Sequence, residues 1–397
     1  MTRRWLRDAE TQGFGPDNLP FGIFAPPGGT PRVGVRVGGR VLDVSAILPD
    51  PEFVRPSLNA FMARGSTAWR AARSKIGGRF STAEKRQVLE PHLHPLDQVC
   101  LYAPFDVADL FSFRGSLDYL RATATGAPRG GVTDPCFAPQ GAHGCSATVA
   151  LSGQPVNRPL GITRETVAPS RLTTTTQLDI GACLGFVVGA GSEMGRQVST
   201  GDFAQHVFGV VLVGEWTAHD LVQDAAPSGT VRTPTVATSI SPWVVPLDAL
   251  GAARVPGRGQ DPPVPRYLRR VADWGLDVTM DMRVNGASVA HPSAASLYWT
   301  GDQMLAHLTS NGAPLRTGDL YTSGPVSGPG EGRQASLLEL THGRADDPAG
   351  RFLRDGDTVT ITAQAKGLAG GIINFGEVTA TVTEPVSTSG GQRIAAG

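Results

Sequence analysis

The chain has 397 residues, of which 40% are hydrophobic and 18% charged, and its formal net charge is zero. Because no run of one charge sign stands out, composition gives no support to a nucleic-acid groove or an anionic membrane surface as partner. The four cysteines lack a CxxC spacing and fit a reducing compartment better than a disulfide framework. No apolar run reaches the ~18 residues of a membrane-spanning helix. The basic N-terminus also lacks the apolar core of a signal peptide, so we expect a cytoplasmic protein.

Glycine and proline are spread along the whole chain and separate short runs of β-branched and aromatic residues, which predict strands. In chain order the elements are a strand region at 33–45, a helix at 57–77, strands at 206–216, 241–250 and 277–286, a helix at 296–312, and a strand at 357–367. Ser57 is a plausible N-cap of the first helix, and Gly312 closes the second. In the last strand, alternation places Val359 and Ile361 on one face, which is typical of a half-buried strand.

A proline-rich segment at 90–111 separates a small N-terminal region from the larger remainder. We place a boundary near residue 98, which gives an N-terminal unit of residues 1–98 and a C-terminal unit of residues 99–397. The N-terminal unit combines strand and helix signals, and strand signals outnumber helix signals along the chain as a whole. The predicted fold class is therefore β-rich α+β.

Six strings resemble the fumarylacetoacetase family and occur in the order found in that family. They are NLPFGIFAPPG (18–28), GEWTAHDL (214–221), ISPWVVPLDAL (240–250), LYWTGDQMLAHLTSNGAPLRTGDLYTSGPVSG (297–328), LLEL (337–340) and FLRDGDTVTITAQAKG (352–367). The resemblance covers nearly the whole chain. It implies a small SH3-like N-terminal barrel, a C-terminal mixed β-roll that holds the active site, and a homodimer that acts on a small molecule.

The resemblance also implies a chemistry. Family members cleave a carbon–carbon bond in a 1,3-dicarbonyl acid with a divalent metal, Mg²⁺ or Ca²⁺, held by carboxylates as Lewis acid and template. A His–Glu dyad activates water, and Arg, Gln and Lys side chains stabilise the charge that develops. Since a fold does not guarantee a function, each of these positions has to be checked.

The metal positions are only half retained. The stretch QLDIGACLGFVVG (177–189) matches the strand on which the family carries two glutamates, and those positions are Gly181 and Cys183. The other two positions keep carboxylates, at Asp109 and Glu215. Because Mg²⁺ and Ca²⁺ need several oxygen ligands, we expect no cofactor. The alternative is a zinc-like site made by Asp109, Cys183, Glu215 and a water.

Most other functional positions of the family are replaced. The family's histidine, arginine, lysine, threonine and tyrosine correspond to Ser116, His219, residues 233–235, Pro325 and Ala142, respectively. The glutamine falls at Val222, although the neighbouring Gln223 can serve if one residue is inserted. With only three lysines in the chain, the family lysine has no replacement nearby.

Two retained or substituted residues are the candidate catalytic pair. Glu339, in the LLEL string, keeps the place of the family's dyad glutamate, and His219 could face it as an acid–base partner. The alternative for His219 is a structural hydrogen bond to Asp220 or to a backbone carbonyl.

The candidate substrate-binding residues are Arg114, Ser116, His143 and Gln223. Arg114 is the best anion anchor among them. Its alternative is a surface arginine stacked on Phe111 or Phe113.

Three functions remain open from the sequence. The first is metal-independent acid/base chemistry, such as isomerisation, cyclisation or condensation, on an enolisable 1,3-dicarbonyl or polyketide-like molecule of natural-product biosynthesis. The second is a non-catalytic binding or scaffold role. The third is the family's carbon–carbon hydrolysis with rewired ligands.

Overall fold

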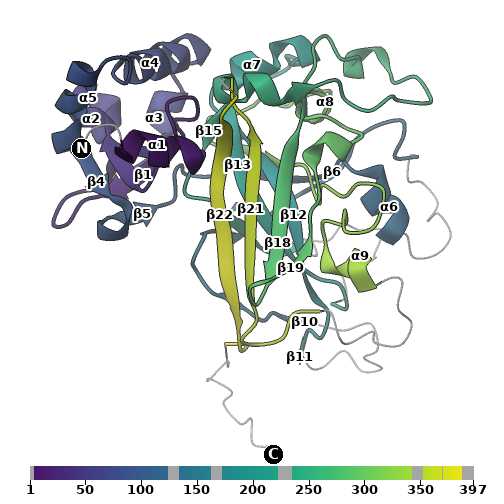
Figure 1. Cartoon of the computed structure of the whole chain (residues 1–397). Coiled ribbons are helices and arrows are strands. Elements are labelled where there is room, and N and C mark those ends of the chain that lie inside the picture. The colour runs from purple at the N-terminus through teal and green to yellow at the C-terminus, as the bar shows by residue number, and fades with distance from the viewer. Residues whose placement is uncertain are drawn as a thin grey trace, which may run out of the picture.

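Strands dominate the computed structural model, which describes residues 4–123, 134–161, 172–221, 235–341, 352–368 and 370–386. The predicted β-rich α+β class is confirmed. Figure 1 shows an N-terminal unit at one side of the molecule and long strands of the C-terminal part beside it.

The N-terminal unit is built on an antiparallel five-stranded sheet. Its order is β4 (Leu93–Pro95), β3 (Arg40–Asp43), β2 (Arg32–Val37), β1 (Phe21–Ala25) and β5 (Cys100–Tyr102). The run at 33–45 is therefore a hairpin, and Gly38 takes a φ of 57° in its turn. The helices of this unit are α1 (Arg4–Thr11), α2 (Val44–Ile47), α3 (Asn59–Met62), α4 (Ser66–Gly78) and α5 (Ala83–Leu89).

The expectation of one helix at 57–77 is wrong, because the chain forms α3 and α4 there. Gly65 separates them with a φ of 82°, a left-handed conformation that a helix interior does not accommodate. Ser57 is not the N-cap, because that position is Leu58, which makes no side-chain capping bond; the Ser57 hydroxyl accepts from the N–H of Asn59 at 3.4 Å, one residue before the cap.

The C-terminal part contains a central sheet with the order β7 (Gln140–His143), β6 (Leu110–Arg114), β20 (Leu320–Thr322), β12 (Leu178–Val188), β13 (Val207–Ala218), β14 (Thr235–Ile240) and β8 (Val149–Leu151). The strand expected at 206–216 is β13. The strand expected at 241–250 is mostly absent, because only β15 (Val245–Pro246) pairs there before a 3₁₀ turn at Leu247–Ala253. Pro246 has no N–H to continue the ladder.

A second sheet of five strands packs against the central one. Its order is β19 (Ala287–Ala290), β18 (Val278–Val284), β21 (Thr358–Lys366), β22 (Ile372–Thr383) and β9 (Val156–Asn157). Val359 and Ile361 are both buried on one face of β21, as the alternation predicts. Two small antiparallel pairs complete the described strands: β10 (Leu160–Gly161) with β11 (Thr173–Thr174), and β16 (Arg254–Val255) with β17 (Gly275–Leu276).

The paired strands β12 and β13 form the centre of the molecule and are covered on both faces. Ile180, on one face of β12, belongs to the core shared with the second sheet, whereas Cys183, on the other face, belongs to the core shared with the N-terminal unit. Every residue of β12 is buried. This double burial explains why its sequence is a continuous apolar run rather than an alternating one.

The helices of the C-terminal part are short: α6 (Leu117–Thr123), α7 (Phe203–His206), α8 (Gly301–Leu308) and α9 (Leu337–Thr341). The helix expected at 296–312 begins later, at Gly301, because Thr300 and Gln303 form a capping box there. Gly312 lies beyond its end with a φ of 84°.

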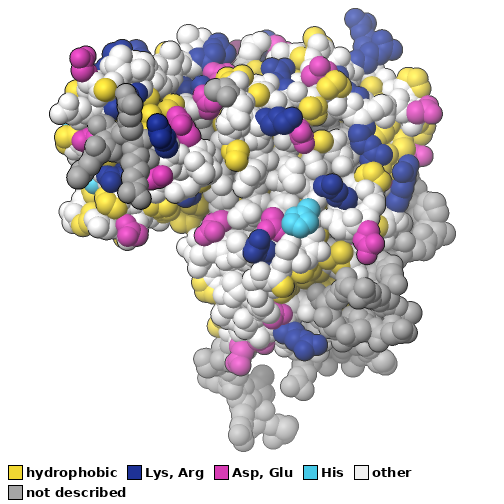
Figure 2. Space-filling view, in the orientation of Figure 1, with side chains coloured by type: hydrophobic (Ala, Val, Ile, Leu, Met, Phe, Trp, Pro, Cys, Tyr) yellow, Lys and Arg dark blue, Asp and Glu magenta, His cyan; other side chains and the backbone are white. Residues whose placement is uncertain are grey.

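On the face in Figure 2, basic and acidic side chains are interspersed without an extended region of either sign. Among the described residues, no helix has both the length and the apolar character required to cross a membrane.

Gly22 offers a test of how the two parts are joined. The N–H of Phe21 donates to the carbonyl of Val244 at 2.9 Å, and a Cβ at Gly22 would lie 2.5 Å from the carbonyl oxygen of Pro242. We expect Gly22→Ala to lower the free energy of unfolding by about 1–3 kcal/mol, since the backbone must move to admit the methyl group. Urea denaturation measures this change.

Gly39→Ala is the matched control, because nothing lies within 4 Å of a Cβ at that position. We expect its effect to stay within about 0.5 kcal/mol. Equal destabilisation by the two substitutions would show that the contact with Pro242 is not limiting.

Candidate functional site

The candidate site is built on one face of β12. Asp179, Gly181 and Cys183 are spaced two residues apart, so their side chains point to the same side of the strand. Gly181 pairs with Glu215 on β13, which brings that carboxylate to the same region. The segment before α9 crosses here as well, since Ser336 forms a β-bridge with Gly181.

Gly181 is covered by Pro325. A Cβ at Gly181 would lie 2.8 Å from Cγ of Pro325, closer than a Cβ normally approaches another atom. The proline ring therefore occupies the space into which a longer side chain at this position would extend. A longer side chain at position 181 would therefore require a smaller or displaced residue at position 325.

Glu215 is buried and held by hydroxyl groups. The Ser112 hydroxyl donates to its Oε1 at 2.5 Å, and the Thr322 hydroxyl donates to the same oxygen. Burial raises the pKa of Glu215, and the hydrogen bonds from Ser112, Thr322 and Cys183 oppose that rise. Burial also raises the pKa of the Cys183 thiol well above its ordinary value, so the thiol is protonated at neutral pH.

Asp109 belongs to a different cluster. Its carboxylate lies 2.7 Å from Nε2 of the exposed His143 and 3.0 Å from Nη2 of Arg316. Asp109 thus shares no contact with Glu215 or Cys183. The structure does not bring together the three groups of the alternative zinc-like site.

Glu339 lies on α9 and is 8% exposed. The hydroxyls of Ser327 and Ser336 both donate to its Oε2, at 2.6 and 2.8 Å. Burial raises the pKa of Glu339, the two serine hydrogen bonds lower it, and the neighbouring Asp179 raises it further. Within the described residues Oε1 has no hydrogen-bond partner, so this oxygen is the one available for proton transfer.

His219 pairs with Asp179 and not with Asp220, the partner considered from the sequence. Its Nε2 lies 2.8 Å from Oδ2 of Asp179, whereas Asp220 accepts from the N–H of Thr176 at 2.7 Å. The other oxygen of Asp179 accepts from the N–H of Leu337 at 2.8 Å. Asp179 therefore connects His219 to the helix that carries Glu339.

The predicted substrate-binding residues are placed differently from one another. Ser116 is fully buried; its hydroxyl donates to the Ser327 carbonyl at 2.7 Å and accepts from the N–H of Tyr119 at 3.1 Å. Both partners are main-chain groups, and the second caps the start of α6. His143 is exposed, and its Nε2 lies 2.7 Å from the carboxylate of Asp109. Gln223 and Val222 both lie outside the described residues.

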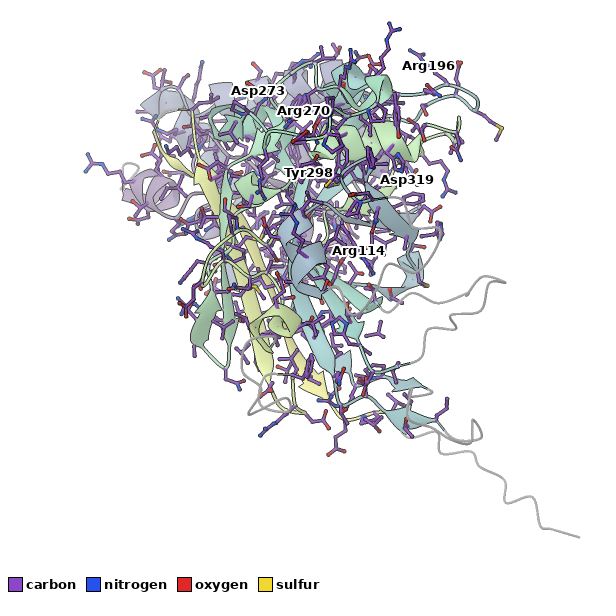
Figure 3. All side chains as sticks on the ribbon, turned by 90° about the vertical axis from the view of Figure 1, so that its right-hand side faces the viewer. Arg114, Arg196, Arg270, Asp273, Tyr298 and Asp319 are labelled. Carbon is purple, nitrogen blue, oxygen red and sulfur yellow. The ribbon has the colours of Figure 1, made fainter. Side chains whose placement is uncertain are left out.

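Arg114 is exposed at the end of β6, on the side of the molecule turned toward the viewer in Figure 3. In the described part of the chain it does not stack on an aromatic ring, unlike Arg36 or Arg254. Its charge lowers the pKa of both Tyr119 and Glu215, against the larger effect of burial. Arg114 thus places a positive charge beside two groups of the site.

Sequence reasoning missed Tyr119, which α6 places among the acidic groups. Burial raises the pKa of its phenol above the ordinary range, and Asp179, Glu339 and Glu215 raise it further. The phenol is therefore a neutral proton donor at physiological pH. The sequence carries one signal for it: Tyr119 follows by three residues the position of the missing family histidine.

Comparisons with known proteins agree with this architecture. Residues 17–104 match the family model for the fumarylacetoacetase N-terminal domain, and residues 120–383 match that for the fumarylacetoacetate hydrolase C-terminal domain. The chain is 31% identical to human fumarylacetoacetase, covering 93% of this chain and 96% of that one. It is 32% identical to the fumarylacetoacetase of Arabidopsis thaliana, covering 92% and 94%.

Two solved structures share the fold. The fumarylacetoacetate hydrolase of Exiguobacterium antarcticum aligns with a TM-score of 0.55 at 19% identity, covering 92% of this chain and 99% of that one. A maleylpyruvate hydrolase from Sphingobium, solved with manganese(II) and pyruvate, aligns with a TM-score of 0.52 at 16% identity, covering 92% and 100%.

The expectation that this chain has no cofactor is contradicted by these comparisons. The fumarylacetoacetase relatives and the manganese-containing maleylpyruvate hydrolase point to a divalent cation in proteins of this kind. The expectation failed because it rested on the loss of two ligand positions alone, Gly181 and Cys183.

The residues present do not fit the family's way of holding that cation. In the described ranges, no three His, Cys, Asp or Glu side chains are grouped to hold a metal ion. Asp109 is engaged by His143 and Arg316, and Pro325 blocks the place above Gly181. We therefore derive no reaction step through a bound ion.

The burial of Glu215 leads to a pH-dependent prediction. Its raised pKa means that the native state keeps a proton that the unfolded state has already lost, so this group's contribution to stability falls as pH rises through that interval. Glu215→Gln keeps an acceptor oxygen but does not titrate. We compare the free energy of unfolding of Glu215→Gln with that of the unmodified protein. The difference should shift in favour of the variant between about pH 4 and about pH 8, by ~1.4 kcal/mol for each unit by which the pKa of Glu215 is raised.

Urea denaturation at the two pH values measures this difference. Glu331→Gln, at an exposed position, is the control and should show no such pH dependence. A constant offset between Glu215→Gln and the unmodified protein would contradict a raised pKa.

The contact between Gly181 and Pro325 predicts how the ligand set can be restored. We expect the triple substitution Gly181→Glu, Cys183→Glu and Pro325→Thr to bind Mn²⁺ at least about tenfold more tightly than the unmodified chain, as measured by titration calorimetry. The double substitution that keeps Pro325 should fall short of the triple, because the ring blocks the new side chain. Equal affinities of the double and triple variants would refute the steric coupling.

Proposed function

The chain belongs to the fumarylacetoacetase family, and from this premise we propose that it is an enzyme acting on an enolisable 1,3-dicarbonyl acid by proton transfer to and from Glu339. The observation that supports the proposal is the setting of this carboxylate. Oε2 is fixed by two serine hydroxyls while Oε1 is unpartnered among the described residues, and burial raises its pKa toward the range of an effective general base.

The proposed step uses this chain's own residues. Glu339 takes a proton from the carbon between the two carbonyl groups, and the electron pair of that C–H bond moves onto a carbonyl oxygen. The guanidinium of Arg114 offsets the charge of the substrate carboxylate or enolate, and the phenol of Tyr119 donates a hydrogen bond to it. Return of the proton to a different atom completes an isomerisation. While the proton remains on Glu339, the enolate can instead attack an electrophilic carbon and so cyclise or condense.

Carbon–carbon hydrolysis is the second candidate, and the names of the relatives favour it. In this case Glu339 would take its proton from a water molecule that attacks the carbonyl carbon. The family's dyad histidine is replaced by Ser116, whose hydroxyl is engaged with the main chain. Glu339 would thus activate water without that imidazole.

The remaining expectations from the sequence are part of the same proposal. They are the division near residue 98, the SH3-like character of the N-terminal unit, a homodimer, a cytoplasmic location and a place in natural-product chemistry. A separate five-stranded N-terminal sheet supports a division of this kind, but its strand β5 ends at Tyr102, which favours a boundary a few residues after 98.

Glu339→Gln tests the proposal. Acetylpyruvate in its enol form is the probe, and stopped-flow absorbance follows its relaxation to the keto form. We expect the substitution to lower kcat by at least about a hundredfold, the usual contribution of a general base. Chromatography of the products separates the two candidates, because pyruvate and acetate appear only if the carbon–carbon bond is cleaved.

Glu331→Gln, an exposed substitution in the loop before α9, is the matched control and should leave kcat unchanged. If the unmodified protein neither accelerates the relaxation nor cleaves acetylpyruvate, and Glu339→Gln behaves identically, the non-catalytic binding role is favoured.

A further inference from the structure

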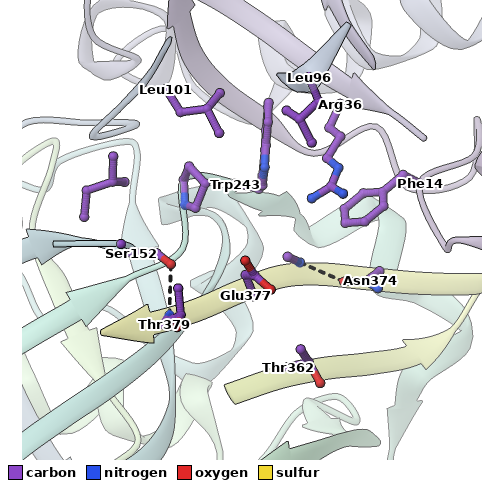
Figure 4. Close-up of a pocket in the computed structure, with 14 residues that line it drawn as sticks. Phe14, Arg36, Leu96, Leu101, Ser152, Trp243, Thr362, Asn374, Glu377 and Thr379 are labelled. Atoms are coloured by element: carbon purple, nitrogen blue, oxygen red, sulfur yellow. Dashed lines mark hydrogen bonds between the residues drawn. The ribbon is translucent and has the colours of Figure 1, made fainter. Parts of the chain in front are cut away.

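A cavity of about 360 Å³ lies away from the candidate site, where the N-terminal unit meets the second sheet of the C-terminal part (Figure 4). Phe14 and Leu101 line it from the N-terminal side, and Thr362 and Asn374 line it from β21 and β22. Its volume is in the lower part of the range of small-molecule sites. A ligand held there would contact both parts of the chain at once.

One wall of the cavity is apolar and rigid. Trp243 lies in it with its side chain 1% exposed, and Leu96 and Leu101 face the same space. The Trp243 ring is fixed by close packing, since a Cβ at Gly22 would lie 2.8 Å from it. Because Trp243 is already covered, an apolar group of a ligand would bury against Leu96 and Leu101, which are only partly buried.

Arg36 supplies the positive charge of the cavity. Its guanidinium carbon lies 3.6 Å from the centre of the Phe14 ring, and its Nε donates to the carbonyl of Gly38 at 3.1 Å. Within the described residues neither of its Nη atoms has a hydrogen-bond partner. Burial lowers the pKa of Arg36 to about 10, with Glu377 acting in the opposite direction, so the group stays charged at neutral pH.

Glu377 supplies the negative charge. It lies on β22 opposite Thr362 of β21, and its side chain is exposed. Although Figure 4 shows Arg36 and Glu377 on facing sides of the cavity, the two groups are not among the ion pairs of the described residues, so more than 4.0 Å separates their charged atoms. They are the two charged side chains of the lining.

We propose that this cavity binds a zwitterionic small molecule, an α-amino acid with an apolar or aromatic side chain. Its carboxylate pairs with the Nη atoms of Arg36, its ammonium group pairs with Glu377, and its side chain packs against Leu96 and Leu101. Two opposite charges held apart across a cavity match the two charges of a zwitterion, whereas a ligand with one charge leaves the other protein group unpaired. This site is independent of the proposed reaction at Glu339.

Titration calorimetry on the full chain with three probes tests the proposal. We expect L-phenylalanine to bind at least about tenfold more tightly than 3-phenylpropionate or phenethylamine, each of which keeps the ring and one of the two charges. L-phenylalanine should also raise the Tm in proportion to its occupancy of the site, because it binds the folded chain.

Glu377→Gln is the decisive variant, because the residue is exposed and the substitution keeps its shape. It should weaken L-phenylalanine binding at least about tenfold, whereas 3-phenylpropionate should bind as tightly or more tightly, because the negative charge that repels its carboxylate is removed. Arg36→Met should abolish the binding of both carboxylates. Because Arg36 packs on Phe14, the thermal melting curve of the Arg36→Met protein is recorded to confirm that it is folded. Arg40→Met, at an exposed position, is the control.

Absence of L-phenylalanine binding to the unmodified chain would overturn the proposal. So would an unchanged affinity in Glu377→Gln, or tighter binding of either singly charged probe. Acetylpyruvate turnover is measured in the same Glu377→Gln protein and should be unaffected, which keeps the two sites distinguishable.

Discussion

The pairing of β12 with β13 constrains everything around it. Both strands are covered on both faces, by the second sheet on one side and by the N-terminal unit on the other. A polar side chain on this pair cannot reach bulk water, so it must find partners within the protein or cost several kcal/mol, roughly 2–7 for an unpaired group. Asp179 and Glu215 are the carboxylates that meet this condition, each with its own set of donors.

The same constraint explains the form that the altered ligand positions take. A carboxylate at position 181 or 183 would be buried and would need donors or a cation, as Asp179 on the same strand is held by two backbone N–H groups and His219. Glycine and cysteine at 181 and 183 bring no charge, and Pro325 fills the volume released at the first of them. Glu215 remains because two hydroxyls donate to it and because burial favours its protonated form. Gly181 and Cys183 thus need no ionic partner, and Glu215 has hydrogen-bond donors, so none of these groups has to face solvent.

The sequence indicates some parts of this arrangement and not others. The strand at 206–216 could be predicted from its run of apolar β-branched residues, and the strand at 357–367 from its alternation, since both patterns reflect burial. The helix break at Gly65 and the loss of the strand at 241–250 each depend on one residue with a special backbone conformation. A pattern read over ten or more residues does not register the effect of such a single residue. The partner of His219 could not be predicted, because Asp179 is 40 residues away in sequence and becomes adjacent only through strand pairing.

Tyr119 is a similar case, since only the packing of α6 places its phenol near Asp179 and Glu339. The resemblance to a family locates positions, but it does not say which new side chain enters the space that a replaced one leaves. Ser116 shows this clearly: it stands at a catalytic position, yet its hydroxyl caps a helix.

Asp179 is the residue through which the fold positions the candidate chemistry. Its 2% exposed carboxylate binds His219 at the end of β13, the N–H of Ile180 on its own strand, and the N–H of Leu337 at the start of α9. The last of these holds the start of the helix whose first turn carries Glu339. Burial is the main cause that raises the pKa of Glu339, and the charge of Asp179 adds to it. One buried side chain therefore helps to position the proposed base and contributes to its basicity. Because a buried carboxylate is tolerated only when its donors are in place, the geometry of the site is tied to the correct pairing of the two central strands.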